Sequence, residues 1–179
     1  MWHEEQAKLL RFEIESHLFN AIEQEHLREL VKIPLTTARR ALSHECDSSW
    51  PLLPLMVCEG ICGRYQHALP AAAALQLLLA AGDVFDDIED EDSPGSLPAK
   101  YGQAIATNAA TALIILAEKA LAHLVNEETT RQAGICILQK VNEFYTTACI
   151  GQHLDLPSNE CPPISEDRYF HIAAMKSAS

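Results

Sequence analysis

The sequence predicts an all-α protein, and two features of its 179 residues support that fold class. In almost every segment, apolar residues return every three to five positions, as they do along one face of an α-helix. No run of β-branched and aromatic residues alternates with polar ones, as a half-buried strand requires. With 48% hydrophobic and 21% charged residues, the composition is that of a soluble globular chain. We therefore expect one helical domain over residues 1–179.

The expected helices follow one another with short breaks. They span residues 4–32, 36–42, 52–65, 68–89, 99–125, 128–153 and 165–179. Pro34 ends the first helix because proline cannot continue it, whereas Pro70 is tolerated in the first turn of its helix. A turn-rich loop, residues 92–96, follows the helix that ends at residue 89. Residues 172–175 form an apolar face with no later segment to cover it, so we expect the bundle to lack its C-terminal helices.

The charge of the chain limits its partners. It carries 25 acidic and 13 basic residues, a formal charge of −12, and nucleic-acid binding needs clustered Lys and Arg. The first residues lack the basic and apolar regions of a signal peptide. The apolar runs 68–81 and 109–117 are shorter than the roughly 20 residues that span a bilayer. We therefore expect a cytoplasmic protein with no nucleic-acid partner, no membrane span and six reduced cysteines.

Seven acidic residues fall between positions 83 and 92. Within this cluster Asp86 and Asp90 are four residues apart, so they share a helix face about 6 Å apart along the axis, with Asp83 and Asp87 beside them. Repulsion between these carboxylates, at the negative end of the helix dipole, would destabilise the helix. A hard cation such as Mg²⁺ removes that cost and keeps coordination positions for substrate phosphates. The alternative is a solvated acidic helix end.

Three segments of the chain carry a family resemblance. They are AGDVFDDIED at residues 81–90, GQHLDL at 151–156 and YFHIAAMKSA at 169–178. In this order they resemble the DDxxD motif, the GQxxDL helix end and the KT pair of the trans-isoprenyl diphosphate synthase (polyprenyl synthetase) family. The resemblance implies an isoprenoid-synthase-type helical bundle around a central apolar cavity that holds a prenyl tail. It also implies a Mg²⁺-dependent prenyltransferase or terpene synthase-like enzyme that binds an allylic isoprenyl diphosphate.

The resemblance assigns roles to seven residues. They are Asp86, Asp87 and Asp90 as catalytic and Mg²⁺-binding groups, Gln152, Lys176 and Ser177 at the diphosphate, and Phe85 in the cavity wall. The metal would stabilise the diphosphate as the C–O bond ionises to an allylic cation, and the cavity would exclude water that quenches this cation. Taken singly, Gln152 and Lys176 are equally typical of a polar helix surface, and Phe85 of core packing.

The chain also departs from the family pattern. In chain-elongating members a basic GKRxRP stretch precedes the third helix and holds isopentenyl diphosphate, whereas SSWPLLP at residues 48–54 has no Lys or Arg. The His that usually precedes the Asp motif aligns with Leu79, with Gln76 in place of a Glu. The basic RRG after the motif is replaced by residues 95–97. A diphosphate without cationic partners would be left unpaired, so ordinary elongation with isopentenyl diphosphate is not expected.

Two interpretations follow from these matches and departures. Arg39 and Arg40 come too early in the chain, unless a different alignment or loop brings them to the anion site. The family's second Asp-rich motif, which lies well beyond the KT pair, does not occur within these 179 residues. The favoured interpretation is an enzyme that ionises an allylic diphosphate for prenyl transfer or terpene-synthase-type chemistry. The alternative is a non-catalytic or regulatory subunit of a heteromeric prenyl diphosphate synthase.

A pair of cysteines bears on the second interpretation. Cys58 and Cys62 weakly resemble a motif that marks a partner interface in small, non-catalytic subunits of the family. Small residues packed in a helix interface are the alternative explanation. In either case the family resemblance implies a homodimer or a heteromer.

Overall fold

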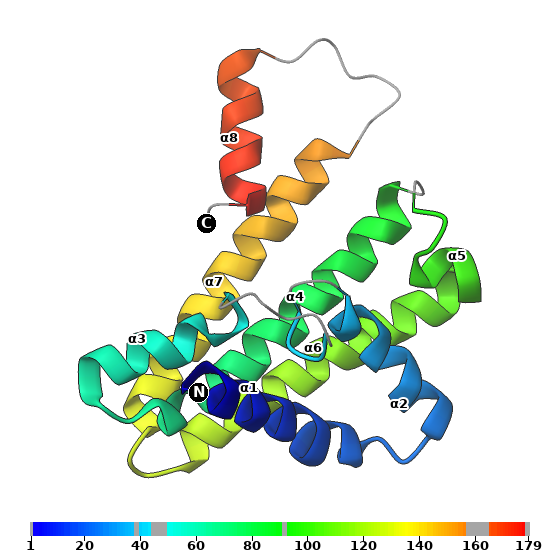
Figure 1. The fold of residues 1–179 in the computed structure, drawn as a ribbon. Coiled ribbons are helices and arrows are strands. Elements are labelled where there is room, and N and C mark those ends of the chain that lie inside the picture. The colour runs from blue at the N-terminus through cyan, green and yellow to red at the C-terminus, as the bar shows by residue number, and fades with distance from the viewer. Residues whose placement is uncertain (1, 38–39, 44–49, 91–92, 157–164, 178–179) are drawn as a thin grey trace. The chain divides into compact units, whose positions relative to one another are not determined.

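The computed structural model describes residues 2–37, 40–43, 50–90, 93–156 and 165–177, without the side chains of residues 2, 3, 17, 18 and 177. Every regular element within these ranges is a helix, which confirms the all-α fold class. The chain divides into two compact units, residues 1–134 and 135–179, and each is described by itself. Figure 1 shows the helices in chain order.

The N-terminal segment is not the single helix that the sequence predicts for residues 4–32. It consists of α1 Trp2–Phe12, the π-helix η1 Glu13–Leu18, the 3-10 helix η2 Phe19–Ala21 and α2 Glu25–Lys32. Residues 22–24 are not helical, because the Gln24 side chain caps α2 by accepting a hydrogen bond from the Leu27 amide. Arg28 stabilises the same break by donating from Nε and Nη2 to the Ile22 carbonyl, at 3.0 and 2.6 Å.

Short elements lead to the helices of the core. They are η3 Ile33–Thr36, η4 Trp50–Leu52, α3 Leu53–Cys62 and η5 Tyr65–Ala68. The prediction of a helix over residues 36–42 was wrong for its described part, where η3 ends at Thr36 and residues 40–43 form a bend and turn. The α3 helix stops at Gly63, whose φ of +70° is the left-handed conformation that glycine adopts without steric cost.

Two long helices form the core of the first unit. The α4 helix spans Leu69–Asp90, close to the predicted 68–89, and α6 spans Gln103–Asn126. A separate short helix, α5 Leu97–Tyr101, precedes α6, and Gly102 at φ +84° breaks the chain between them. The predicted helix over residues 99–125 is therefore two helices.

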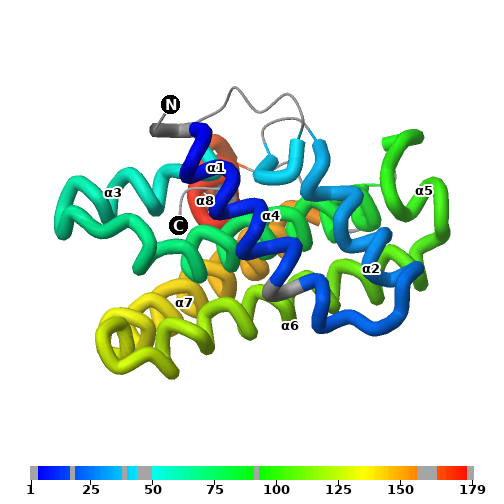
Figure 2. Tube along the Cα trace, turned by 60° about the horizontal axis from the view of Figure 1, so that its bottom comes forward, coloured from blue at the N-terminus to red at the C-terminus, as the bar shows by residue number. Residues whose placement is uncertain are grey.

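The α4 and α6 helices run side by side (Figures 1 and 2). Both helices carry fully buried alanines. These are Ala72, Ala73, Ala80 and Ala81 on α4, and Ala106, Ala109, Ala110, Ala117 and Ala120 on α6. Side chains this small let two backbones approach closely and exclude water along the contact. The contact holds α4 along its length and so fixes the direction of its acidic end.

By length and composition alone, two helical stretches could cross a membrane. They are residues 65–90 and Gln103–Asn126, and about half of each apolar window is buried inside the fold, 50% and 44% respectively. Helices at the centre of a protein core meet the same criterion. The expectation of no membrane span therefore stays a prediction.

The α7 helix, Arg131–Asp155, begins in the first unit and continues into the second, and α8 spans Glu166–Ser177. Side chains at the start of α7 satisfy carbonyls at the end of α6. Thr130 Oγ1 donates to Leu124 O at 2.7 Å, and Arg131 Nε donates to Val125 O at 3.1 Å. Gly134 lies against this corner, where an added Cβ would be 2.8 Å from Leu124 Cβ.

Candidate active site

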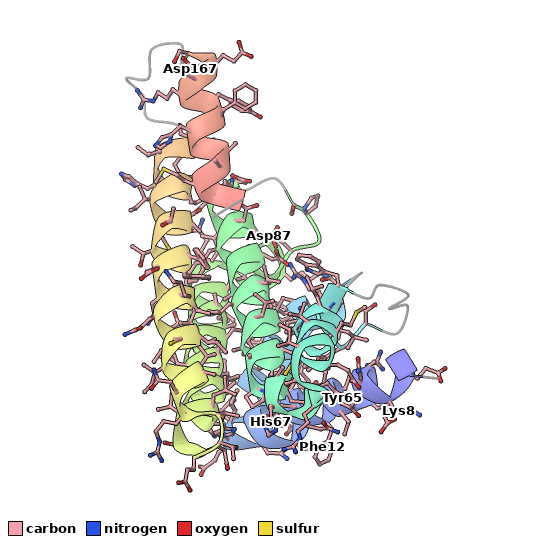
Figure 3. All side chains as sticks on the ribbon, turned by 90° about the vertical axis from the view of Figure 1, so that its left-hand side faces the viewer. Lys8, Phe12, Tyr65, His67, Asp87 and Asp167 are labelled. Carbon is pink, nitrogen blue, oxygen red and sulfur yellow. The ribbon has the colours of Figure 1, made fainter. Side chains whose placement is uncertain are left out.

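Four aspartates lie on one side of the last two turns of α4. At about 100° per residue, Asp83, Asp86, Asp87 and Asp90 fall within an arc of about 100° around the helix axis. Asp86 and Asp87 are half-buried, whereas Asp83 and Asp90 are exposed. Figure 3 shows Asp87 near the end of the helix. The carboxylates therefore form an acidic face at the C-terminal end of α4, where the helix dipole is negative.

The acidic face has the oxygen ligands that Mg²⁺ prefers. No three Asp, Glu, His or Cys side chains of the described residues converge into a ready metal cage. Mg²⁺ does not need such a cage, because it is usually held by one or two carboxylates together with water and substrate phosphates. The donor set of Asp86, Asp87 and Asp90 therefore fits a magnesium ion that is shared with a diphosphate.

A basic residue from a distant part of the chain meets this face. Arg40 Nη2 lies 2.5 Å from Asp83 Oδ2, although the two residues are 43 positions apart. The Arg40 side chain is 15% exposed and that of Asp83 is 49% exposed, so the pair is partly buried. From the sequence, Arg40 was expected at the anion site only if a different alignment or loop brought it there. The structure places Arg40 against Asp83, which lies one helical turn before Asp86 and Asp87 on α4.

The described positions where the family pattern fails carry no cationic side chain. Residues 48–49 lie outside the described residues, and in η4 Pro51 and Leu52 are buried in the core. Ser96 caps α5 by accepting a hydrogen bond from the Ala99 amide at 3.4 Å. Gln76 is fully buried on α4, and neither its Nε2 nor its Oε1 has a hydrogen-bond partner. None of these groups is a cation that could bind a second diphosphate.

The second unit contains the other predicted diphosphate contacts. Lys176 Nζ on α8 lies 3.0 Å from Asp155 Oδ2 on α7, and Gln152 is half-buried one turn before Asp155. No role was predicted for Asp155 from the sequence, so its pairing with Lys176 was missed. The side chain of Ser177 lies outside the described residues.

Gly151 explains how α7 and α8 come close enough for that pair. A Cβ at Gly151 would lie 2.6 Å from the Lys176 amide nitrogen and 2.8 Å from the Met175 carbonyl carbon. Only glycine permits this separation, because any side chain would meet the α8 backbone. The GQxxD part of the motif therefore sets the helix crossing as well as supplying polar groups.

The predicted site residues fall into two sets. Asp86, Asp87 and Asp90 belong to the first unit, whereas Gln152 and Lys176 belong to the second. Each set is brought together within its own unit. Phe85 is half-buried on α4, about 100° around the helix from Asp86 and on the side away from Asp87. Its place in a cavity wall stays a prediction.

The cysteine pair lies at the C-terminal end of α3. Cys58 Sγ and Cys62 Sγ are 3.5 Å apart, and neither thiol forms a disulfide. Burial raises the pKa of the Cys58 thiol, and the Cys62 thiol and the Glu59 carboxylate raise it further. A thiol with a raised pKa is a weak nucleophile at neutral pH, so Cys58 is not an activated catalytic cysteine.

Most of this chain matches a known protein family. The sequence profile of the polyprenyl synthetase family matches residues 43–179. Tryptophan prenyltransferase ComQ of Bacillus subtilis subsp. natto is 32% identical over 108 residues, which are 60% of this chain and 31% of that protein. The Bacillus spizizenii ComQ is 29% identical over 116 residues, or 65% of this chain and 38% of that protein.

A solved structure has the same fold. The geranylgeranyl pyrophosphate synthetase of the archaeon Geoglobus acetivorans superposes with a TM-score of 0.76 at 23% identity. The superposition covers 97% of this chain and 54% of the synthetase. The fold is therefore of the isoprenoid-synthase type that the sequence predicts. The chain spans about half the length of that structure and matches about a third of each curated relative.

Proposed function

Because the chain belongs to the polyprenyl synthetase family, we propose that it binds an allylic isoprenyl diphosphate and ionises it for prenyl transfer. Mg²⁺ held by Asp86, Asp87 and Asp90 would bind the diphosphate. The observation that carries this proposal is the acidic face of α4, which α6 and Arg40 hold in place. Its carboxylates repel one another and lie at the unfavourable end of a dipole, so a bound cation would stabilise them.

The proposed reaction separates charge and then joins two groups. The C–O bond between the prenyl carbon and the diphosphate breaks, and its electron pair leaves with the diphosphate oxygen. The allylic cation is captured by an electron-rich acceptor, which then loses a proton. Mg²⁺ supplies stabilisation of the charge that develops on the leaving diphosphate. Asp86, Asp87 and Asp90 would bind the metal, and Gln152, Lys176 and Ser177 would contact the diphosphate.

We propose an acceptor other than isopentenyl diphosphate. Chain elongation needs a cationic site for a second diphosphate, and the described residues 50–54 and 93–97 provide none. The two curated relatives are both named tryptophan prenyltransferases, and an indole ring is a neutral, electron-rich acceptor that needs no such site. A tryptophan-type side chain is therefore the acceptor to test first. A cytoplasmic location and a homodimeric or heteromeric assembly remain predictions.

The test measures diphosphate release from geranyl, farnesyl and geranylgeranyl diphosphate with Mg²⁺. The wild-type protein is compared with an Asp86→Ala/Asp90→Ala variant, with and without a tryptophan peptide as acceptor. We expect release by the wild type, addition of one prenyl group to the peptide by mass spectrometry, and loss of at least about 100-fold in the variant. Glu118→Ala, an exposed carboxylate on α6, is the matched control and should behave as the wild type.

Other outcomes would decide against parts of this proposal. No release and no binding of any prenyl diphosphate would overturn it and favour the non-catalytic subunit. Incorporation of isopentenyl diphosphate would contradict the argument from residues 50–54 and 93–97. Release that needs only water would indicate terpene-synthase-type chemistry instead of transfer to an acceptor.

A further inference from the structure

Residues 40–43 bring a guanidinium to the acidic face of α4. Arg40 in this segment donates from Nη2 to Asp83 Oδ2, and the side chain is 15% exposed. The positions where chain-elongating relatives carry basic residues have none here. Arg40 is thus a cation that the described structure brings to the acidic face from outside α4.

The position of Arg40 is fixed before any ligand binds. Arg11 on α1 donates from Nε to Ala41 O at 3.1 Å and from Nη2 to Ser43 O at 2.6 Å. The Ser43 amide donates back to the Arg40 carbonyl at 3.1 Å. Ala41 and Leu42 are buried in the core between these contacts. The segment is held by side-chain and backbone bonds, so binding through Arg40 would cost little additional ordering.

The ion pair with Asp83 leaves Arg40 able to bind an anion. A guanidinium has five N–H donors in a planar fork, and the bond to Asp83 uses one of them. Asp83 lies three and four residues before Asp86 and Asp87, so their Cβ atoms are within about 6 Å of its own. An anion held by a metal at Asp86 and Asp87 would therefore lie beside the remaining donors. Two parallel N–H donors match the oxygens of a phosphate group.

We propose that Arg40 is a diphosphate-binding residue of this chain and that Asp83 and Arg11 are its positioning residues. The ligand class is the diphosphate head group of the allylic substrate, bound together with Mg²⁺. This inference rests on the proposed function and adds a residue to the same site. Arg40 would add a cationic contact to the allylic head group, and it would not restore the separate site for isopentenyl diphosphate that residues 48–54 lack.

The experiment measures binding of inorganic pyrophosphate, with Mg²⁺ present, by isothermal titration calorimetry. The proteins are the wild type, Arg40→Gln, Arg40→Lys, Asp86→Asn/Asp90→Asn and the control Arg64→Gln, an exposed arginine in the same unit. We expect Arg40→Gln to weaken binding by about tenfold or more, because it removes charge-assisted hydrogen bonds. Arg40→Lys keeps the charge but loses the planar fork, so its affinity should lie between the two. Arg64→Gln should bind as the wild type.

The variants separate the possible failures. If the wild type binds and Asp86→Asn/Asp90→Asn does not, but Arg40→Gln binds as the wild type, this inference is wrong and the proposed function stands. If Arg64→Gln weakens binding as much as Arg40→Gln, the effect is one of net charge, and the inference is again wrong. If the wild type does not bind magnesium pyrophosphate, the proposed function itself fails. Should Arg40→Gln not fold, Arg40→Lys decides, since equal affinity to the wild type would contradict a role for the fork.

Discussion

The two units of this protein each hold a cation beside an aspartate, but by different means. In the first unit, Arg40 reaches Asp83 from a loop that Arg11 ties to α1. In the second, Lys176 reaches Asp155 from α8, whose backbone lies against Gly151 of α7. The first pair depends on hydrogen bonds to carbonyls, and the second on the close approach of two helices.

This difference shows which residues matter for each pair. The position of Arg40 should be sensitive to loss of the Arg11 hydrogen bonds and insensitive to small changes in α4, the helix that it faces. A close helix crossing is sensitive to a single added methyl group at the point of contact. The same type of ion pair should therefore respond to different substitutions in the two units.

Glycine substitution should give the largest contrast. In Gly151→Ala the new Cβ would meet backbone atoms of Lys176 and Met175 below 3.0 Å, so α8 must shift. We expect a loss of about 3 kcal/mol in the free energy of unfolding, measured by urea denaturation. The control is Gly82→Ala on α4, where nothing lies within 4 Å of the added Cβ. That variant should gain about 0.5–1 kcal/mol, because alanine favours a helix interior.

Equal changes in the free energy of unfolding for Gly151→Ala and Gly82→Ala would contradict the claim that the α7–α8 crossing depends on close backbone contact. A neutral Gly151→Ala would show that α7 and α8 can separate without cost, and that Lys176 is not held by their crossing. A destabilising Gly82→Ala would show that α4 is packed more tightly at its acidic end than the open space around this glycine indicates.

Loss of the Arg11 hydrogen bonds to residues 41 and 43 should have the next largest effect. Arg11→Met leaves the Ala41 and Ser43 carbonyls without their charged donor in a mostly buried segment, which should cost about 2 kcal/mol in urea denaturation. Affinity for magnesium pyrophosphate, measured well below the unfolding midpoint, should also fall severalfold if Arg11 positions Arg40. Lys8→Met, on the exposed side of α1 (Figure 3), is the control and should change neither quantity. A stability loss with unchanged affinity would reduce Arg11 to a structural role.

The sequence could predict the local features of this fold and missed the long-range ones. The bounds of α4 and the shared face of Asp86 and Asp90 follow from helical spacing within a few turns. The break at residues 22–24 depends on the cap at Gln24 and the Arg28 bonds, which compete with a continuous helix. The apolar spacing alone carries no signal of that competition.

The Arg40–Asp83 pair could not be predicted from the sequence for a different reason. Its two residues are 43 positions apart, and no local pattern connects them. The family motif places its basic residues at positions 48–54, in a different segment from Arg40. Which basic residue meets the acidic face is decided by how the chain folds back after η3, a tertiary property that one sequence does not display.

Replacing Asp155 or Asp83 by asparagine should have the smallest effects. The two losses of stability should show which of the two ion pairs contributes more to the free energy of unfolding. Asp155→Asn leaves Lys176, whose side chain is 30% exposed, able to turn to water, so the loss should be below about 0.5 kcal/mol. Asp83→Asn leaves Arg40, which is 15% exposed, with less access to water, and the loss should be about 1 kcal/mol. Urea denaturation at low and high salt measures both. Salt should reduce the difference in the free energy of unfolding between wild type and variant more at Asp155 than at Asp83, because exposed charges are screened more strongly than partly buried ones. The reverse order would mean that Arg40 is more solvated than Lys176.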